Sequence, residues 1–260
     1  MRIVVCIKQV PSTNKVVMDP VKNTIIREGK TAVINPNDLY ALELAITLKE
    51  RYGAHIIVFS MGIPATERLL RDCVARGADE AVLLSDRAFA GADTLATSYT
   101  LSRGIEAAGG VDLIFCGKMA IDGDTAHIGP QLAVTMGLPH VGGVFEITEL
   151  DRDFITIRRL VDTRVEKLKI RLPALLATGK DINLPRMPSI SGIRRSLGDV
   201  FLSKGAAAIG ADPSKTGLAG SPTQVLEIFT SRNNRTTIPI EGEVSTQLEQ
   251  ILALVTEAKK

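Results

Sequence analysis

The stretch HIIVFSMGIPATERLLRDCVARGADEAVLL, residues 55–84, has the pattern of one strand, one helix and a second strand. It begins with an apolar, β-branched run at 55–60, which is typical of a strand buried on both faces of a parallel sheet. A turn containing Gly and Pro follows, and then a helix with an apolar face around 69–74 that ends at Gly77. A second apolar run occupies Glu80–Leu84. The stretch therefore predicts a β-α-β unit with two parallel strands.

The same alternation continues on both sides of this unit. Arg2–Ile7 and Asp112–Cys116 are short apolar runs that read as further buried strands. Asn35–Asp38 is a turn and N-cap cluster that precedes an amphipathic helix, and Asp93 is placed to cap another helix that starts near Thr94. Strands that alternate with helices in this way predict a doubly wound, mostly parallel sheet with flanking helices.

The pattern changes after Val144. Phe154–Leu160 and Thr163–Ile170 alternate apolar with charged residues, which indicates an antiparallel excursion with one solvated face. Pro173–Thr178 is apolar again and is expected to rejoin the main sheet. The fold class is therefore α/β.

The C-terminal part has a different composition. Residues 203–222 are rich in Gly, Ala, Ser and Pro and are expected to form an extended linker. Ser245–Ala258 has an apolar stripe at helical spacing, and a terminal helix of this kind usually docks on something. We therefore expect a nucleotide-binding α/β domain at 1–202 and a C-terminal arm at 203–260, whose amphipathic helix packs on a partner subunit.

Composition excludes several functional classes. The formal net charge is +2 and aromatic residues make up 4% of the chain, so an electrostatic or stacking platform for nucleic acid is not expected. No run approaches the length of a membrane span. Three scattered cysteines in apolar runs indicate free thiols in a reducing cytoplasm. With no C-x-x-C pair and no histidines at helical ligand spacing, no metal site is expected.

Chemistry is expected in the loops after the strands, because open α/β sheets bind ligands beyond the carboxyl ends of their strands. The loops at Cys6–Val10, Ser60–Gly62, Ser85–Asp93 and Gly117–Thr125 are rich in Gly, small polar residues and carboxylates. Neither a dinucleotide fingerprint nor a P-loop is present. The residues alone leave two interpretations open, a site for a nucleotide or other anion and a set of well-capped turns. No catalytic triad or dyad is proposed.

Three longer motifs identify a family resemblance. The start VVCIKQVP (residues 4–11), the Asn35-Pro36-Asn37-Asp38 cluster and the stretch CGKMAIDGDTAHIGPQ (116–131) resemble the electron-transferring flavoprotein beta subunits. The last stretch is similar to that family's signature G-x-x-A-I-D-G-D-T-x-x-x-G-P, and the likeness extends over nearly the whole chain. His127 departs from the family pattern, where Gln is frequent.

The resemblance implies an adenine nucleotide, FAD or alternatively AMP, in this crevice. The residues that it implies as cofactor-binding are Cys6, Asn35, Asp38, Met61, Gly117, Ala120, Asp122, Gly123, Asp124, Thr125, Ala126, His127 and Ile128.

The loop at 85–97 resembles the electron-bifurcating, two-FAD members of the family. There Arg87 would lie near a flavin or phosphate, and Asp93, Thr94 and Thr97 would also contact the cofactor. The resemblance implies that NADH gives a hydride to FAD on this subunit. One electron then passes to ferredoxin or flavodoxin, and the other passes through an FAD of the alpha subunit to a partner dehydrogenase. A non-bifurcating carrier with structural AMP, a stand-alone adenine-nucleotide-binding regulatory domain and a purely structural subunit are the alternatives.

The stretch at 180–195 resembles the family's recognition loop for the dehydrogenase, of acyl-CoA, enoyl-CoA-reductase or lactate type. By this resemblance Ile182 and Leu184 are apolar anchors on the partner, and Arg186 lies at the rim of the interface.

Overall fold

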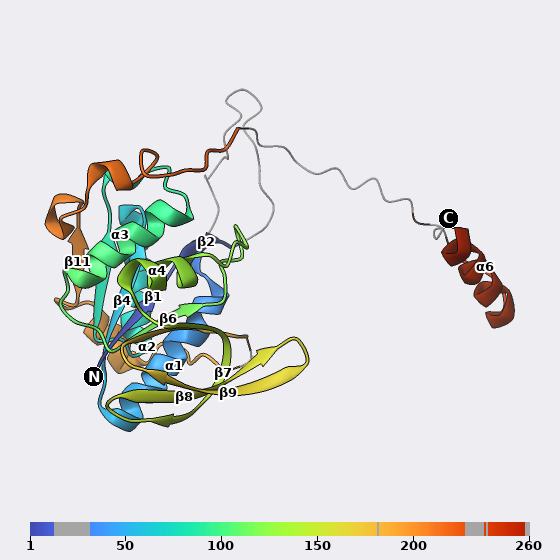
Figure 1. Ribbon diagram of the computed structural model, residues 1–260, viewed down its shortest axis with the longest axis horizontal. Helices are drawn as coiled ribbons and strands as arrows, with labels where there is room; N and C mark the ends of the chain where they lie inside the picture. The colour runs from blue at the N-terminus through green and yellow to red at the C-terminus, as the bar shows by residue number, and fades with distance from the viewer. Residues whose placement is uncertain (13–31, 181, 227–236, 238, 258–260) are drawn as a thin grey trace. The chain divides into compact units, whose positions relative to one another are not determined.

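The computed structural model describes residues 1–12, 32–180, 182–226, 237 and 239–257 (Figure 1). The chain divides into two units, Met1–Gln224 and Val225–Lys260.

In the part of the chain that the structure describes, the first unit is built on a nine-stranded sheet. Seven neighbouring strands are parallel, and two antiparallel strands complete one side. The parallel strands, in their order across the sheet, are β11 (Phe201–Lys204), β5 (Glu80–Leu84), β4 (His55–Met61), β1 (Arg2–Cys6), β6 (Leu113–Gly117), β10 (Ala174–Thr178) and β7 (His140–Leu150).

Helices cover both faces of this sheet, as the sequence predicts. On one face, α1 (Pro36–Tyr52) and α2 (Glu67–Arg76) pack with Ile3 and Val5 of β1 in one apolar core. On the other face, α3 (Thr94–Glu106) and α4 (Ile128–Met136) form a second core with Val4 and Cys6. Because alternate residues of a strand point to opposite faces, β1 contributes to both cores and has to be apolar throughout.

The antiparallel excursion is also present. β8 (Phe154–Val161) pairs with β7 and then with β9 (Arg164–Arg171), which is the edge strand on that side. Ile155 and Ile157 of β8 are fully buried, whereas β9 presents charged side chains to solvent. The prediction of an α/β, doubly wound, mostly parallel sheet is therefore confirmed. β2 (Gln9–Pro11) and β3 (Ala32–Ile34) pair antiparallel in a separate two-stranded sheet.

Residues 203–222 are not the extended linker that their composition suggests. β11 adds a parallel strand beside β5, and the 3-10 turns at Ala207–Ile209 and Pro213–Lys215 follow it. Ile209 is buried in the second core, and the Tyr99 hydroxyl oxygen accepts a hydrogen bond from the amide of Asp212 at 2.9 Å. These contacts join segments far apart in sequence, so local composition does not reveal them.

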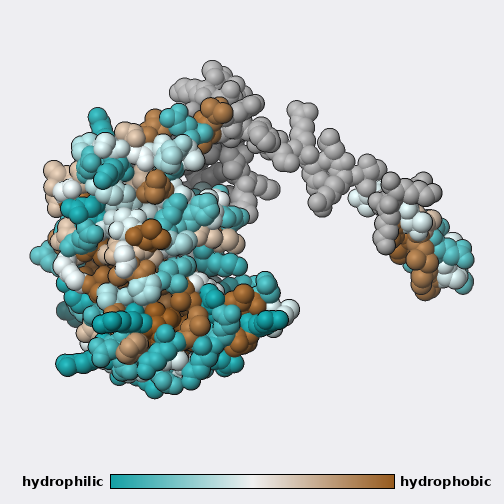
Figure 2. Space-filling model, in the orientation of Figure 1, coloured by the Kyte–Doolittle hydropathy of each residue, from teal (hydrophilic) through white to brown (hydrophobic). Residues whose placement is uncertain are grey.

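The second unit contains the helix α6 (Val244–Glu257). Figure 2 shows hydrophobic and hydrophilic residues on different sides of this helix. The exposed apolar side chains include Leu248, Ile251, Leu252 and Val255. Among the described residues, no helix combines the length and the apolar character needed to cross a bilayer.

Candidate functional site

The candidate site lies at the carboxyl ends of β1 and β6. From β1 the chain continues to β4 and β5 on one side, whereas β6 pairs with β1 on the other side. The strand order therefore reverses between β1 and β6, and this is where open α/β sheets bind their ligands.

Asp38 joins the two strand ends at this point. It lies in the first turn of α1 and is 5% exposed. One carboxylate oxygen accepts a hydrogen bond from the amide of Lys8, just after β1, at 2.8 Å. The other accepts one from the amide of Gly117, the last residue of β6, at 3.2 Å. Burial raises the pKa of Asp38 to about 7 in spite of these hydrogen bonds. Asp38 thus holds the ends of β1 and β6 in place relative to each other.

The loop at 118–127 follows β6 and is held by the N-terminus of α1. The side-chain amides of Asn35 and Asn37 both donate to the carbonyl of Met119, at 3.0 and 2.7 Å. The side-chain oxygen of Asn35 accepts from the amide of Ile121 at 3.3 Å. Gly117 has no room for a side chain, because a Cβ atom would lie 2.5 Å from the carbonyl carbon of Asn37. The Asn35–Asp38 cluster therefore shapes this loop.

The same loop leads into the N-terminus of α4. Asp124 and Ala126 adopt left-handed backbone conformations, at φ 48° and 55°. Left-handed residues that alternate with other conformations, as these two do on either side of Thr125, can orient amides into an anion-binding concavity. His127 is the N-cap of α4 and makes no side-chain capping hydrogen bond. The first amides of a helix lack intrahelical partners, so this end of α4 suits a phosphate group.

The loop residues that the sequence proposes are accessible to a ligand. Asp122, Gly123, Asp124, Thr125, Ala126 and His127 are exposed, and Ala120 and Ile128 are half-buried. The Lys8 ammonium, just after β1, donates to a carboxylate oxygen of Asp122 in this loop at 2.7 Å. Sequence reasoning missed Lys8 and Asn37, although both lie within the motifs that it used.

Cys6 is the last residue of β1 and is buried. Burial raises the pKa of its thiol to about 12, and burial also raises the pKa of Cys116 at the end of β6. Buried thiols of this kind are unreactive, so Cys6 can contribute shape and backbone groups but not a nucleophile. Met61 ends β4 on the same edge of the sheet.

The loop at 85–97 follows β5 along this edge. Arg87 is exposed in a 3-10 turn. Asp93 caps α3, as predicted, by accepting from the amides of Leu95 and Ala96 at 2.9 and 3.0 Å. Its other oxygen accepts from the amide and hydroxyl of Thr223, so the carboxylate is fully engaged within the chain. Thr94 and Thr97 are half-buried in the first turn of α3.

The proposed docking residues differ among themselves. Leu184 is 89% exposed, as an anchor for a partner has to be. Ile182 instead packs partly buried against the first core. Arg186, expected at the rim of an interface, points its guanidinium at Glu43 and Glu50 of α1.

Comparison with known proteins adds an independent line of support. Residues 22–197 match the family model described as the electron transfer flavoprotein domain. The chain is 48% identical over 225 residues to electron transfer flavoprotein subunit beta of Clostridium acetobutylicum, covering 86% of each protein. It is 46% identical over 230 residues to subunit CarD of the caffeyl-CoA reductase-Etf complex of Acetobacterium woodii, covering 88% of this chain and 87% of CarD. Protein FixA of Azorhizobium caulinodans is 42% identical over 236 residues, with 88% and 84% covered.

Proposed function

Because this chain belongs to the electron transfer flavoprotein family, with relatives named as its beta subunits, we propose that it is the beta subunit of a heterodimeric electron carrier. In this proposal the crevice between β1 and β6 holds an adenine nucleotide, and α6 packs on the alpha subunit.

The observation that carries the proposal is the construction of the crevice. Asp38 holds the ends of β1 and β6 together, and the exposed loop at 121–127 leads into the N-terminus of α4, which has no side-chain cap. These features fit a nucleotide, because a helix N-terminus favours phosphate oxygens and exposed backbone and hydroxyl groups can bind a ribose. We expect Thr125 and the amides at 125–128 to bind the phosphates.

The nucleotide of the proposal is FAD and the complex is of the bifurcating type. A flavin supplies the chemistry that side chains lack, since it accepts a hydride and releases electrons one at a time. The complex would oxidise NADH, reduce ferredoxin or flavodoxin, and pass the second electron through the alpha subunit's FAD to a dehydrogenase. Support comes from the resemblance of residues 85–97, in which Arg87 is exposed.

The partner is proposed to be a dehydrogenase of acyl-CoA or lactate type. CarD is named as a subunit of a complex with caffeyl-CoA reductase, which favours a partner that acts on CoA thioesters.

A simple carrier with AMP in the crevice is the second candidate. It is favoured by Asp93, whose carboxylate is already used by the α3 cap and Thr223. A larger cofactor that reaches this loop has to bind without that side chain.

The nucleotide content of the chain copurified with its alpha subunit tests the bifurcating proposal and the simple-carrier proposal together. Acid extraction and chromatography should find two FAD and no AMP per heterodimer. One FAD with one AMP would replace the bifurcating proposal by the second candidate. A heterodimer without nucleotide in the beta subunit would contradict both.

A further inference from the structure

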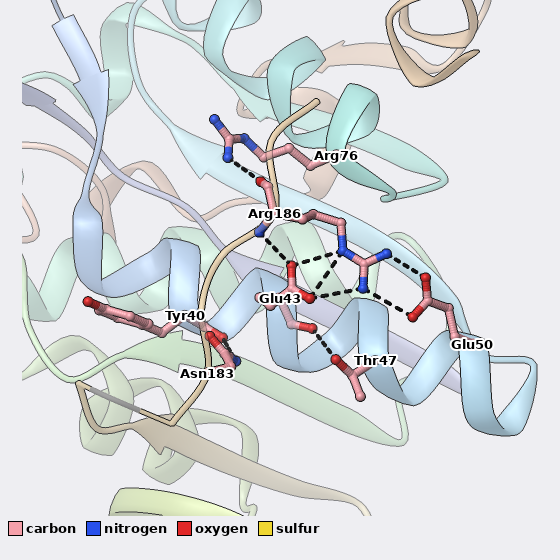
Figure 3. Close-up of polar contacts among 7 residues, drawn as sticks. All are labelled: Tyr40, Glu43, Thr47, Glu50, Arg76, Asn183 and Arg186. Atoms are coloured by element: carbon pink, nitrogen blue, oxygen red, sulfur yellow. Dashed lines mark hydrogen bonds and ion pairs between the residues drawn. The ribbon is translucent and has the colours of Figure 1, made fainter. Parts of the chain in front are cut away.

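The segment at 183–189 is held by hydrogen bonds to the middle and the end of α1 (Figure 3). The Arg186 guanidinium donates to both oxygens of Glu43, at 2.9–3.1 Å, and to Glu50, with Nη2 and Oε2 at 3.0 Å. The Arg186 amide also donates to Glu43, at 2.9 Å. The side-chain amide of Asn183 donates to the carbonyl of Tyr40 at 2.9 Å.

This attachment is unusually strong for a surface loop. Glu43 is only 8% exposed, and planar guanidinium-carboxylate pairs of this kind are short and directional. The hydrogen bond from Arg186 lowers the pKa of Glu50, so the Glu50 carboxylate stays charged near neutral pH. A buried carboxylate that loses its cation is costly, which keeps Arg186 directed at α1 rather than at solvent.

The segment is held from a second side by α2. The Arg76 guanidinium donates to the carbonyl of Arg186 at 2.7 Å, and the amide of Ser189 donates to the carbonyl of Ala75 at 3.3 Å. With its backbone fixed on both sides, the chain leaves Leu184 and Met187 outside, at 89% and 77% exposure. We refer to residues 183–189 as the docking segment.

The helix that holds the docking segment also holds the nucleotide crevice. Asn35, Asn37 and Asp38, at the N-terminus of α1, bind the loop at 117–121, as described above. Tyr40, Glu43 and Glu50 lie further along the same helix. α1 therefore contacts both sites through separate sets of residues.

We propose that α1 couples the two sites, so that nucleotide in the crevice reduces the local opening of the docking segment, with Glu43 and Glu50 as positioning residues that act through Arg186. The inference rests on the proposed nucleotide function of the crevice. A nucleotide that orders the loop at 117–127 stabilises the first turn of α1, against which that loop is bound. A segment attached to the ordered helix then opens less often, and by linkage a partner seated on the segment strengthens nucleotide binding.

Hydrogen exchange of the complete heterodimer tests this coupling. The complex is depleted of nucleotide and then measured alone, with AMP and with FAD. We expect amides at 117–131 to exchange more slowly with nucleotide, and amides at 183–189 to slow by at least about fivefold, at the lower end of ordinary coupling between sites.

Glu50→Gln removes one half of the attachment at an exposed position and is the main variant. Its docking segment should no longer respond to nucleotide, while the response at 117–131 persists. If Glu50 had a purely structural role, the Glu50→Gln substitution would raise the exchange rate of the docking segment equally with and without nucleotide. Glu106→Gln is the matched control, because Glu106 is an exposed glutamate paired with Arg103 on α3 and touches neither site.

Arg186→Lys provides a second variant that retains the charge but not the forked geometry, and it should behave like Glu50→Gln. A wild-type complex that gains protection at 117–131 but not at 183–189 overturns the coupling. So does a Glu50→Gln variant whose docking segment still responds. If nucleotide does not slow exchange at 117–131 at all, the proposed function is contradicted, and the coupling, which rests on it, is contradicted as well.

Discussion

Asp38 is a buried carboxyl group whose protonation should influence stability near neutral pH. Its pKa in the folded chain is about 7, raised mainly by burial, whereas an unfolded aspartate has a pKa of about 4. The folded state thus holds the proton more tightly, and this stabilisation is complete below about pH 4. It is lost as pH rises through about 7.

Asp38→Asn should therefore flatten the pH dependence of unfolding. We expect the wild-type complex to lose more stability than the variant between about pH 5 and about pH 8. The variant should be less stable at both pH values by about 1–3 kcal/mol, because an amide accepts from only one of the two backbone N–H groups. Denaturant unfolding at the two pH values measures both effects. Equal pH dependence in the two proteins would contradict the high pKa.

Gly117 and Gly123 offer a matched pair of substitutions in the same loop. At Gly117 a Cβ atom would lie 2.5 Å from both the backbone carbon of Asn37 and a carboxylate oxygen of Asp38, whereas nothing lies within 4 Å at Gly123. Gly117→Ala should therefore cost about 1–3 kcal/mol and release nucleotide. Gly123→Ala should leave the stability unchanged, because an added Cβ atom meets no neighbour. Melting temperature and bound nucleotide after gel filtration are the measurements, and a neutral Gly117→Ala would show that the crevice is not rigid.

At the scale of single elements, the start of α3 depends on Asp93. Asp93→Ala removes the cap and the contact with Thr223, so we expect a loss of about 1–2 kcal/mol. Asp93→Asn keeps one capping oxygen and should cost less. Thermal unfolding compares the two variants. If Asp93→Asn instead keeps full stability but loses nucleotide, Asp93 contacts the cofactor directly.

The regular elements could be predicted because each depends on its own residues. Glu80–Leu84 is a strand with the predicted bounds, since an apolar run buried on both faces has few other possibilities. α4 begins only at Ile128, because the left-handed residues Asp124 and Ala126 interrupt the helical conformation before it. Sequence alone gives no sign of that conformation at non-glycine positions.

The contacts that complete the site could not be predicted in this way. Arg186 and Glu43 are 143 residues apart, and nothing near either residue indicates the pair. An arginine in a basic loop is therefore expected in solvent, whereas the fold places it on α1. The candidate site residues came from a family resemblance, and the structure supplies what that resemblance lacks, namely how Asp38, Asn35 and Asn37 shape the crevice.

At the scale of the whole molecule, α6 presents exposed apolar side chains that the first unit does not need for its own folding. The first unit already has two complete apolar cores, one on each face of its sheet. A helix with exposed Leu248, Ile251 and Leu252 is stable in water only when a second surface covers that stripe. We infer that this surface belongs to the alpha subunit.

Leu248→Glu combined with Leu252→Glu should therefore abolish copurification with the alpha subunit and leave the first unit folded. Charges on the apolar stripe would have to be buried without partners, which costs several kcal/mol. Gln250→Glu places one charge on the opposite side of α6 and is the control, with copurification retained. Affinity purification of the alpha subunit, with circular dichroism of the free chain, gives both readings. If the double variant still binds the alpha subunit, the two subunits are joined through the first unit and α6 has another partner.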